Sequence, residues 1–235
     1  MAETTGGATG RNMQATALPT NQYALTLNSD ASALIVLAHG SATHLGSTHL
    51  VALSKALENE NIATLRFNFR YRMANHAFPG KLSNSINDFY DALQIGLAAG
   101  RGLPTFTAGH SYGGRVMTHL LVDHRLDTAL GPQQDQLKGG VAYSLPLHPK
   151  AKPNLDRWQH LPALRHPILV FAGDRDPMIS PSIASEFKAQ NPSCTFQWIP
   201  GADHGLQLTK QATDPHQSVY QRVARQTRAW IDALS

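Results

Sequence analysis

The chain has 235 residues, 42% of them hydrophobic, so it can bury a sizeable core without disulfides or metal ions. Its single cysteine, Cys194, excludes an intramolecular disulfide and fits a reducing compartment, so we expect a cytoplasmic protein with Cys194 buried at the start of a strand. The formal charge of +4 comes from scattered basic residues, and no apolar run approaches the ~20 residues of a membrane span. We therefore expect no nucleic-acid partner and no membrane partner.

The N-terminal segment differs in composition from the rest of the chain. Residues 1–20 are rich in Thr, Gly and Ala, and they lack the basic head and apolar stretch of a secretory signal. We expect this segment to be a disordered tail. Because no internal repeat or linker divides the remainder, residues 21–235 are expected to form a single domain.

Short apolar runs alternate with helical patterns, which predicts an α/β fold with a mostly parallel central sheet and helices on both faces. The predicted strands are residues 33–38, 63–69, 105–108, 140–143, 168–172 and 195–199, with residues 23–27 as an antiparallel edge strand. The predicted helices are residues 47–60, 83–99, 112–123, 181–190 and 214–234. The connection between residues 143 and 166 is too short for a large cap domain.

The sequence GHSYG at residues 109–113 follows one of these strands and opens one of these helices. This is the context in which a G-x-S-x-G motif forms a sharp strand-to-helix turn that raises its serine above the sheet. The two glycines let neighbouring backbone pass close to the turn. The helix N-terminus also supplies N–H groups and a positive dipole end for an oxyanion. Ser111 is therefore predicted to be a nucleophile.

A nucleophilic serine needs a base, and the base needs a carboxylate that orients it. Asp174 and Asp176 both follow the strand at residues 168–172. We favour Asp176, because Pro177 fixes the turn directly after it, and we assign Asp174 to a turn or capping role.

The base should follow the carboxylate in the chain, on a loop after a strand. His204 meets this condition, since it lies between the last predicted strand and the last predicted helix. His216 is the weaker alternative, because it falls inside that helix. Asp203 is adjacent to His204 and is expected to cap its own loop instead of orienting the imidazole.

The loop after residues 33–38 should supply the second oxyanion donor. We assign the two donors to the backbone N–H groups of Ser41 and Tyr112. His39, in the same loop, is expected to bond to loop backbone and shape the turn. Tyr71, together with Tyr112 and residues 145–158, is expected to form the wall of the substrate pocket. No His, Asp and Cys grouping has metal-ligand spacing that improves on this interpretation, so no metal site is expected.

Several segments together resemble a known family. The segments are LAHG at residues 37–40, LRFNF at 65–69, GHSYGGR at 109–115, LPLHP at 145–149, GDRDP at 173–177 and GADH at 201–204. They resemble bacterial α/β-hydrolases related to dienelactone hydrolases, and more closely the group with testis-expressed protein 30 and KAT8 regulatory complex subunit 3. The resemblance implies an α/β-hydrolase fold and a triad of Ser111, Asp176 and His204, without metal or organic cofactor. Dienelactone hydrolases use a cysteine where this chain has Ser111, which weakens any expectation of a dienelactone substrate.

The function predicted from these residues is a carboxylesterase-like serine hydrolase that takes a small or short-acyl ester as its substrate. A thioesterase, an amidase or a perhydrolase could use the same triad, because the fold does not select among them. The alternative from another class is a non-catalytic interaction module that keeps the fold. The oligomeric state is left unassigned.

Overall fold

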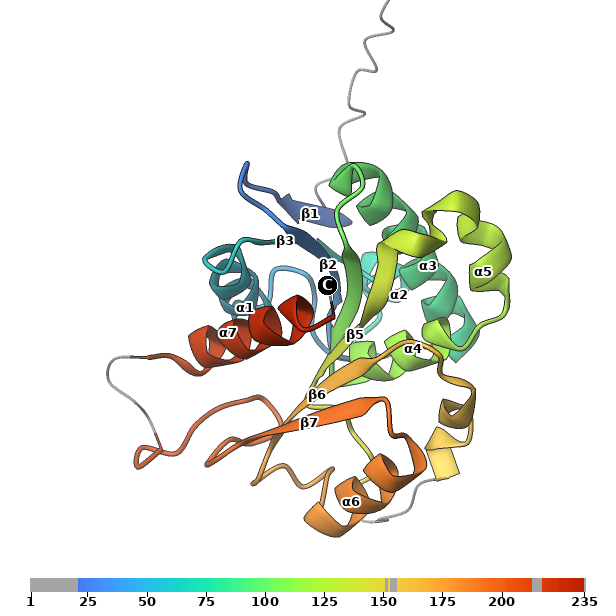
Figure 1. The fold of residues 1–235 in the computed structure, drawn as a ribbon. Helices are drawn as coiled ribbons and strands as arrows, with labels where there is room; N and C mark the ends of the chain where they lie inside the picture. The colour runs from blue at the N-terminus through green and yellow to red at the C-terminus, as the bar shows by residue number, and fades with distance from the viewer. Residues whose placement is uncertain (1–20, 151, 153–155, 213–216, 235) are drawn as a thin grey trace, which may run out of the picture.

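The computed structural model describes residues 21–150, 152, 156–212 and 217–234, so the predicted tail at residues 1–20 lies outside the described residues (Figure 1). A seven-stranded sheet has the order β1-β3-β2-β4-β5-β6-β7, in which β1 pairs antiparallel with β3 and the other pairs are parallel. The strands are β1 (Tyr23–Thr26), β2 (Ala33–Ala38), β3 (Ile62–Phe67), β4 (Thr105–His110), β5 (Leu137–Tyr143), β6 (Ile168–Gly173) and β7 (Cys194–Ile199). The α-helices are α1 (Thr48–Glu58), α2 (Arg70–Met73), α3 (Leu82–Gly100), α4 (Tyr112–Leu121), α5 (Arg125–Leu130), α6 (Pro181–Gln190) and α7 (Val219–Asp232).

Every predicted strand and helix is present, and its ends lie within about three residues of the predicted ones, except at the start of the last helix, which was predicted at residue 214. The predicted strand at residues 63–69 ends early, at Phe67, because the Phe69 N–H donates to the His39 ring, at 3.2 Å, and α2 begins at the next residue. The last helix begins at Val219, because a capping box formed by Ser218 and Gln221 starts it there. The short helices α2 and α5 were not predicted.

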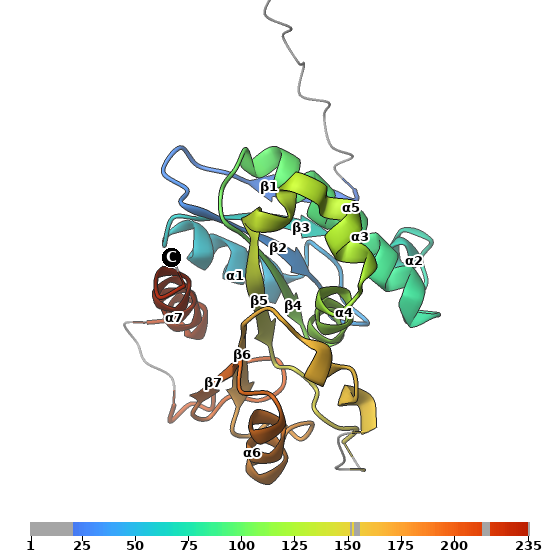
Figure 2. The same ribbon diagram turned by 45° about the vertical axis from the view of Figure 1, so that its right-hand side comes forward.

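Helices cover both faces of the sheet (Figure 2). Side chains alternate along each strand, so Ile35 and Leu37 of β2 pack into the cluster that includes the apolar faces of α1 and α7. Val36 and Ala38 point the other way, into the cluster built with α3, α4 and α6. All six residues of β2 are buried, as the continuous apolar run predicts for a strand with both faces covered. The expected α/β architecture is confirmed, and the described residues include no large cap domain.

Parallel strands end at the same edge of a sheet, so the loops that follow β2, β4, β6 and β7 meet there. These are the loops that carry Ser41, Ser111, Asp176 and His204. Cys194 lies at the opposite end, as the first residue of β7, where burial raises the pKa of its thiol to about 12. The topology therefore gathers the predicted site residues and leaves Cys194 as a buried, protonated side chain.

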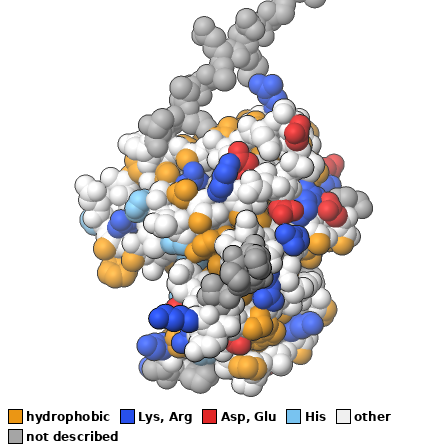
Figure 3. Space-filling view, turned by 90° about the vertical axis from the view of Figure 1, so that its left-hand side faces the viewer, with side chains coloured by type: hydrophobic (Ala, Val, Ile, Leu, Met, Phe, Trp, Pro, Cys, Tyr) orange, Lys and Arg blue, Asp and Glu red, His pale blue; other side chains and the backbone are white. Residues whose placement is uncertain are grey.

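The surface carries no obvious concentration of one charge on the face shown in Figure 3, where Lys and Arg side chains are spread among apolar, acidic and uncharged polar ones. Within the described part of the chain, no helix combines the length and the apolar character needed to span a bilayer.

Candidate active site

Ser111 occupies a strained turn between β4 and α4. Its backbone has φ 51° and ψ −112°, a conformation that residues other than glycine rarely adopt. The Ser111 N–H donates to the Tyr143 carbonyl of β5 at 2.9 Å, which anchors the turn to the sheet. A Cβ at Gly109 would lie 2.1 Å from the Gly113 carbonyl carbon, and one at Gly113 would lie 2.7 Å from the His39 carbonyl oxygen. Both glycines are thus required by close backbone contacts.

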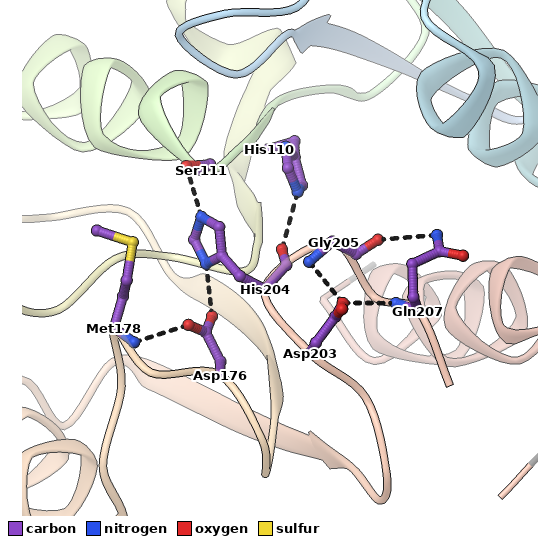
Figure 4. A network of polar contacts seen from close by, with 8 residues as sticks. All are labelled: His110, Ser111, Asp176, Met178, Asp203, His204, Gly205 and Gln207. Atoms are coloured by element: carbon purple, nitrogen blue, oxygen red, sulfur yellow. Dashed lines mark hydrogen bonds and ion pairs between the residues drawn. The ribbon is translucent and has the colours of Figure 1, made fainter. Parts of the chain in front are cut away.

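The side chains of Ser111, His204 and Asp176 form one hydrogen-bonded chain (Figure 4). His204 Nδ1 lies 2.7 Å from Asp176 Oδ2, and its Nε2 lies 2.8 Å from Ser111 Oγ. Because a carboxylate only accepts, Nδ1 carries a hydrogen, and the free Nε2 of a neutral imidazole accepts from the Ser111 hydroxyl. The Asp176 side chain is fully buried, whereas that of His204 is 26% exposed. This geometry can move a proton from a serine hydroxyl to an imidazole.

The other candidates in these loops bond to backbone. Asp174 Oδ1 accepts from the Gly201 N–H at 2.8 Å and so links the two loops, which agrees with the predicted turn or capping role. Asp203 Oδ1 accepts from the N–H groups of Gly205 and Gln207, at 2.8 and 2.9 Å, and caps its own loop as expected. His216 lies outside the described residues.

The loop that carries Asp176 is supported from a segment whose role the sequence did not reveal. The second carboxylate oxygen, Asp176 Oδ1, accepts from the Met178 N–H at 2.8 Å. The Met178 carbonyl in turn accepts from the His148 N–H at 3.1 Å. His148 belongs to the LPLHP segment at residues 145–149, and this segment thus supports the turn that orients Asp176.

The loop after β2 lies against the start of α4, as the close approach of Gly113 to the His39 carbonyl requires. His39 is buried, and its Nδ1–H donates to the Gly40 carbonyl at 2.7 Å while its Nε2 accepts from the Phe69 N–H. Burial lowers the pKa of His39 to about 4, so the ring stays neutral, and its expected role in shaping the turn is confirmed. Among the described residues, the N–H groups of Ser41 and Tyr112 find no hydrogen-bond partner, which leaves both free for a ligand.

The predicted pocket residues fall into two groups. The Tyr71 hydroxyl donates to the Ser41 carbonyl at 2.6 Å, and the Tyr112 hydroxyl donates to Ser85 Oγ at 2.9 Å, so these two tyrosines border the loop and the elbow. Burial raises the pKa of both phenols, which therefore stay protonated. In the 145–158 connection the buried apolar residues, among them Leu147 and Trp158, pack in the core.

His110, the residue before Ser111, makes a further contact in the site, and the sequence did not predict it. It is buried, and its Nε2–H donates to the His204 backbone carbonyl at 3.2 Å (Figure 4). Its ring also packs on His49 of α1, with ring centroids 4.8 Å apart. Burial lowers the pKa of His110 to about 3, so the ring stays neutral and keeps one N–H for this bond. The strand that carries Ser111 therefore also holds the loop that carries His204.

The described residues contain no group of three or more His, Cys, Asp or Glu side chains placed to bind a metal ion.

Comparisons with solved structures identify similar folds at low sequence identity. A dienelactone hydrolase from Anabaena variabilis matches with a TM-score of 0.65 at 17% identity, over 90% of each chain. A monoglyceride lipase from Saccharomyces cerevisiae matches with a TM-score of 0.66 at 13% identity, over 91% of each chain. Est1E from Butyrivibrio proteoclasticus, solved with ferulic acid bound, matches with a TM-score of 0.62 at 18% identity, over 90% of this chain and 94% of that one.

One known protein family matches most of the chain. The family described as an alpha/beta hydrolase domain matches residues 31–232, which include every strand from β2 to β7 and the Ser111, Asp176 and His204 loops. The chain therefore belongs to the alpha/beta hydrolase family.

Proposed function

We propose that this protein is a serine hydrolase that cleaves a carboxylic ester of a small molecule through an acyl-enzyme. The observation that carries the proposal is the hydrogen-bonded chain in which His204 bridges Ser111 Oγ, at 2.8 Å, and Asp176 Oδ2, at 2.7 Å. Nucleophile, base and orienting carboxylate stand in the order and geometry that acyl transfer requires. The strained backbone at Ser111 supports a catalytic role, because such strain persists mainly where function uses it.

The first half of the reaction forms the acyl-enzyme. Ser111 Oγ attacks the ester carbonyl carbon while its proton passes to His204 Nε2, and Asp176 stabilises the imidazolium. The carbonyl oxygen becomes an oxyanion that accepts from the N–H groups of Ser41 and Tyr112, each worth about 10²–10³ in rate. The C–O bond then breaks, and the leaving alcohol takes the proton from His204.

The second half restores the enzyme. Water attacks the acyl carbon and gives a proton to His204, and the same two N–H groups stabilise the second oxyanion. The bond to Ser111 Oγ breaks, the serine recovers its proton from His204, and a carboxylic acid leaves. The proposed steps use no metal or organic cofactor.

Ester chemistry is preferred over thioester, amide or peracid chemistry because the structural neighbours include a dienelactone hydrolase and a monoglyceride lipase. The short 143–166 connection favours small or short-acyl esters. We also propose that this chain is most closely related to the testis-expressed protein 30 group and that the protein is located in the cytoplasm. Among the described residues the N–H groups of Ser41 and Tyr112 have no hydrogen-bond partner, and a non-catalytic interaction module would have no use for such donors.

Labelling with a fluorophosphonate tests the proposal directly. We expect the wild-type protein to gain one phosphonyl group, located on the peptide that contains Ser111 by mass spectrometry. The protein should also hydrolyse p-nitrophenyl esters, and a panel with acyl-CoA and amide substrates beside them ranks the possible reactions. A folded wild-type protein that is neither labelled nor active would support the non-catalytic alternative.

His110 offers a further prediction. We expect His110→Leu to lower kcat for a p-nitrophenyl ester by at least about 10-fold with little change in KM, because the loop that carries His204 loses its anchor. His110→Gln places an amide N–H near the position of Nε2, so it should stay within about threefold of wild type. Steady-state kinetics and thermal unfolding of both variants provide the check. If the glutamine variant were as slow as the leucine variant at equal stability, the hydrogen bond to the His204 carbonyl would have no part in catalysis.

A further inference from the structure

A cavity of about 610 Å³ opens beside the site, in a part of the fold that the sequence did not single out. It lies between α2, the 74–81 loop and the first turns of α3. Tyr71, Phe78 and Pro79 give it an apolar wall, and Lys81, Asn84 and Asn87 stand among its polar residues. The volume falls within the range of small-molecule pockets.

Two hydrogen bonds connect residues of this cavity to Ser41 and Tyr112, the residues whose N–H groups are the candidate oxyanion donors. Tyr71 lines the cavity and donates to the Ser41 carbonyl at 2.6 Å. Ser85 lines it as well and accepts from the Tyr112 hydroxyl at 2.9 Å. The rings of Tyr71 and Tyr112 also meet edge to face, with centroids 6.5 Å apart. The cavity therefore begins one side chain away from both Ser41 and Tyr112.

The strand order places the cavity and His204 on opposite sides of Ser111. The cavity is built after β3, Ser111 follows β4, and His204 follows β7 at the far edge of the sheet. His204 Nε2 must give its proton to the leaving oxygen, so the alcohol part of an ester lies on the β7 side. The acyl part then lies on the side of the cavity.

We infer that this cavity binds the acyl group of the substrate, and that it selects an apolar acyl group with an aromatic ring. The inference rests on the proposed function. Phe78 is 69% exposed although it is a large apolar side chain, and with Tyr71 it offers ring surfaces on which an aromatic group can pack. Arg70 and Asp88 in the same wall neutralise each other in an ion pair 3.3 Å long, so they do not require a charged ligand. The acyl group inferred from the cavity is larger than the one inferred from the short 143–166 connection.

Gly80 provides a variant that fills the cavity without disturbing the fold. It lines the cavity, a Cβ there would meet no atom within 4 Å, and its backbone does not need glycine. p-Nitrophenyl acetate and p-nitrophenyl phenylacetate share one leaving group, so only the acyl group differs between them. We expect wild type to prefer the phenylacetate in kcat/KM by at least about 10-fold after correction for alkaline hydrolysis. Gly80→Phe should slow phenylacetate hydrolysis far more than acetate hydrolysis and so remove this preference, whereas Gly80→Ala should resemble wild type.

Phe78→Ala is the second variant, and Leu27→Ala, which truncates a side chain 46% exposed on the β1–β2 connection, is its matched control. Phe78→Ala should lower the ratio of phenylacetate hydrolysis to acetate hydrolysis by about fivefold, and the control should change neither rate. A ratio of the two rates that does not respond to Gly80→Phe or Phe78→Ala overturns the acyl site alone. Absence of both activities and of fluorophosphonate labelling in wild type overturns the proposed function instead.

Discussion

Replacing Ser111 with alanine is expected to lower kcat for ester hydrolysis by at least about 10⁴-fold, to the level left by binding and the oxyanion donors alone. His204 Nε2 contacts the Ser111 hydroxyl at 2.8 Å, and alanine puts no oxygen in its place. Steady-state kinetics on the best p-nitrophenyl ester, with fluorophosphonate labelling on the same samples, measures the effect. Retention of the rate in the alanine variant would remove Ser111 from the mechanism.

A glycine at the same position separates the chemical role of the residue from its backbone cost. Ser111→Gly should be as inactive as Ser111→Ala, because both lack the hydroxyl. Alanine keeps the unfavourable backbone with φ 51°, whereas glycine adopts it without a steric penalty. The free energy of unfolding of the glycine variant should therefore exceed that of the alanine variant by about 1 kcal/mol, as measured by urea denaturation. Equal stabilities would indicate that the turn stores no strain.

The features that were predictable from sequence are those that depend on local pattern and chain order. The run ALIVLA at residues 33–38 is buried along its whole length, so its composition alone identifies an interior strand. GHSYG lies between an apolar strand and an amphipathic helix, and this context gave the position of Ser111. Asp176 and His204 are predictable from their positions in loops that follow strands, since loops after parallel strands meet at one edge of the sheet.

The features that were missed depend on contacts between distant segments. Phe69 leaves the predicted strand because its N–H bonds to His39, which is 30 residues earlier in the chain. His110 gains its role from the carbonyl of His204, 94 residues later. The cavity needs α2, a helix of four residues, to face the start of α3, and no periodicity marks so short an element. Local pattern carries no information about such pairings, which only the folded chain brings together.

Asp176→Asn is the second large effect, and we expect it to lower kcat by about 10⁴-fold through the tautomer of His204. The Met178 N–H, 2.8 Å from Oδ1, holds the amide oxygen of asparagine on its own side. The amide NH₂ then faces His204 Nδ1, which must accept, so the ring hydrogen moves to Nε2 and points at Ser111. In this tautomer the imidazole cannot take the hydroxyl proton, although every heavy atom keeps its place. Kinetics and a crystal structure of the variant check both statements.

Asp174→Asn is the matched control, since it removes one negative charge from the same loop. Its amide oxygen can still accept from the Gly201 N–H, 2.8 Å from Oδ1 in the wild type, so activity should stay within about threefold of wild type. Equal losses in the two variants would assign the effect to the charge of the loop and not to the bond with His204. A large loss of activity in Asp176→Asn alone would show that Asp176, whose carboxylate contacts His204 Nδ1, sets the tautomer of the imidazole. It would also give this fully buried side chain its role: its contact with the imidazole is what makes the Ser111 hydroxyl a nucleophile.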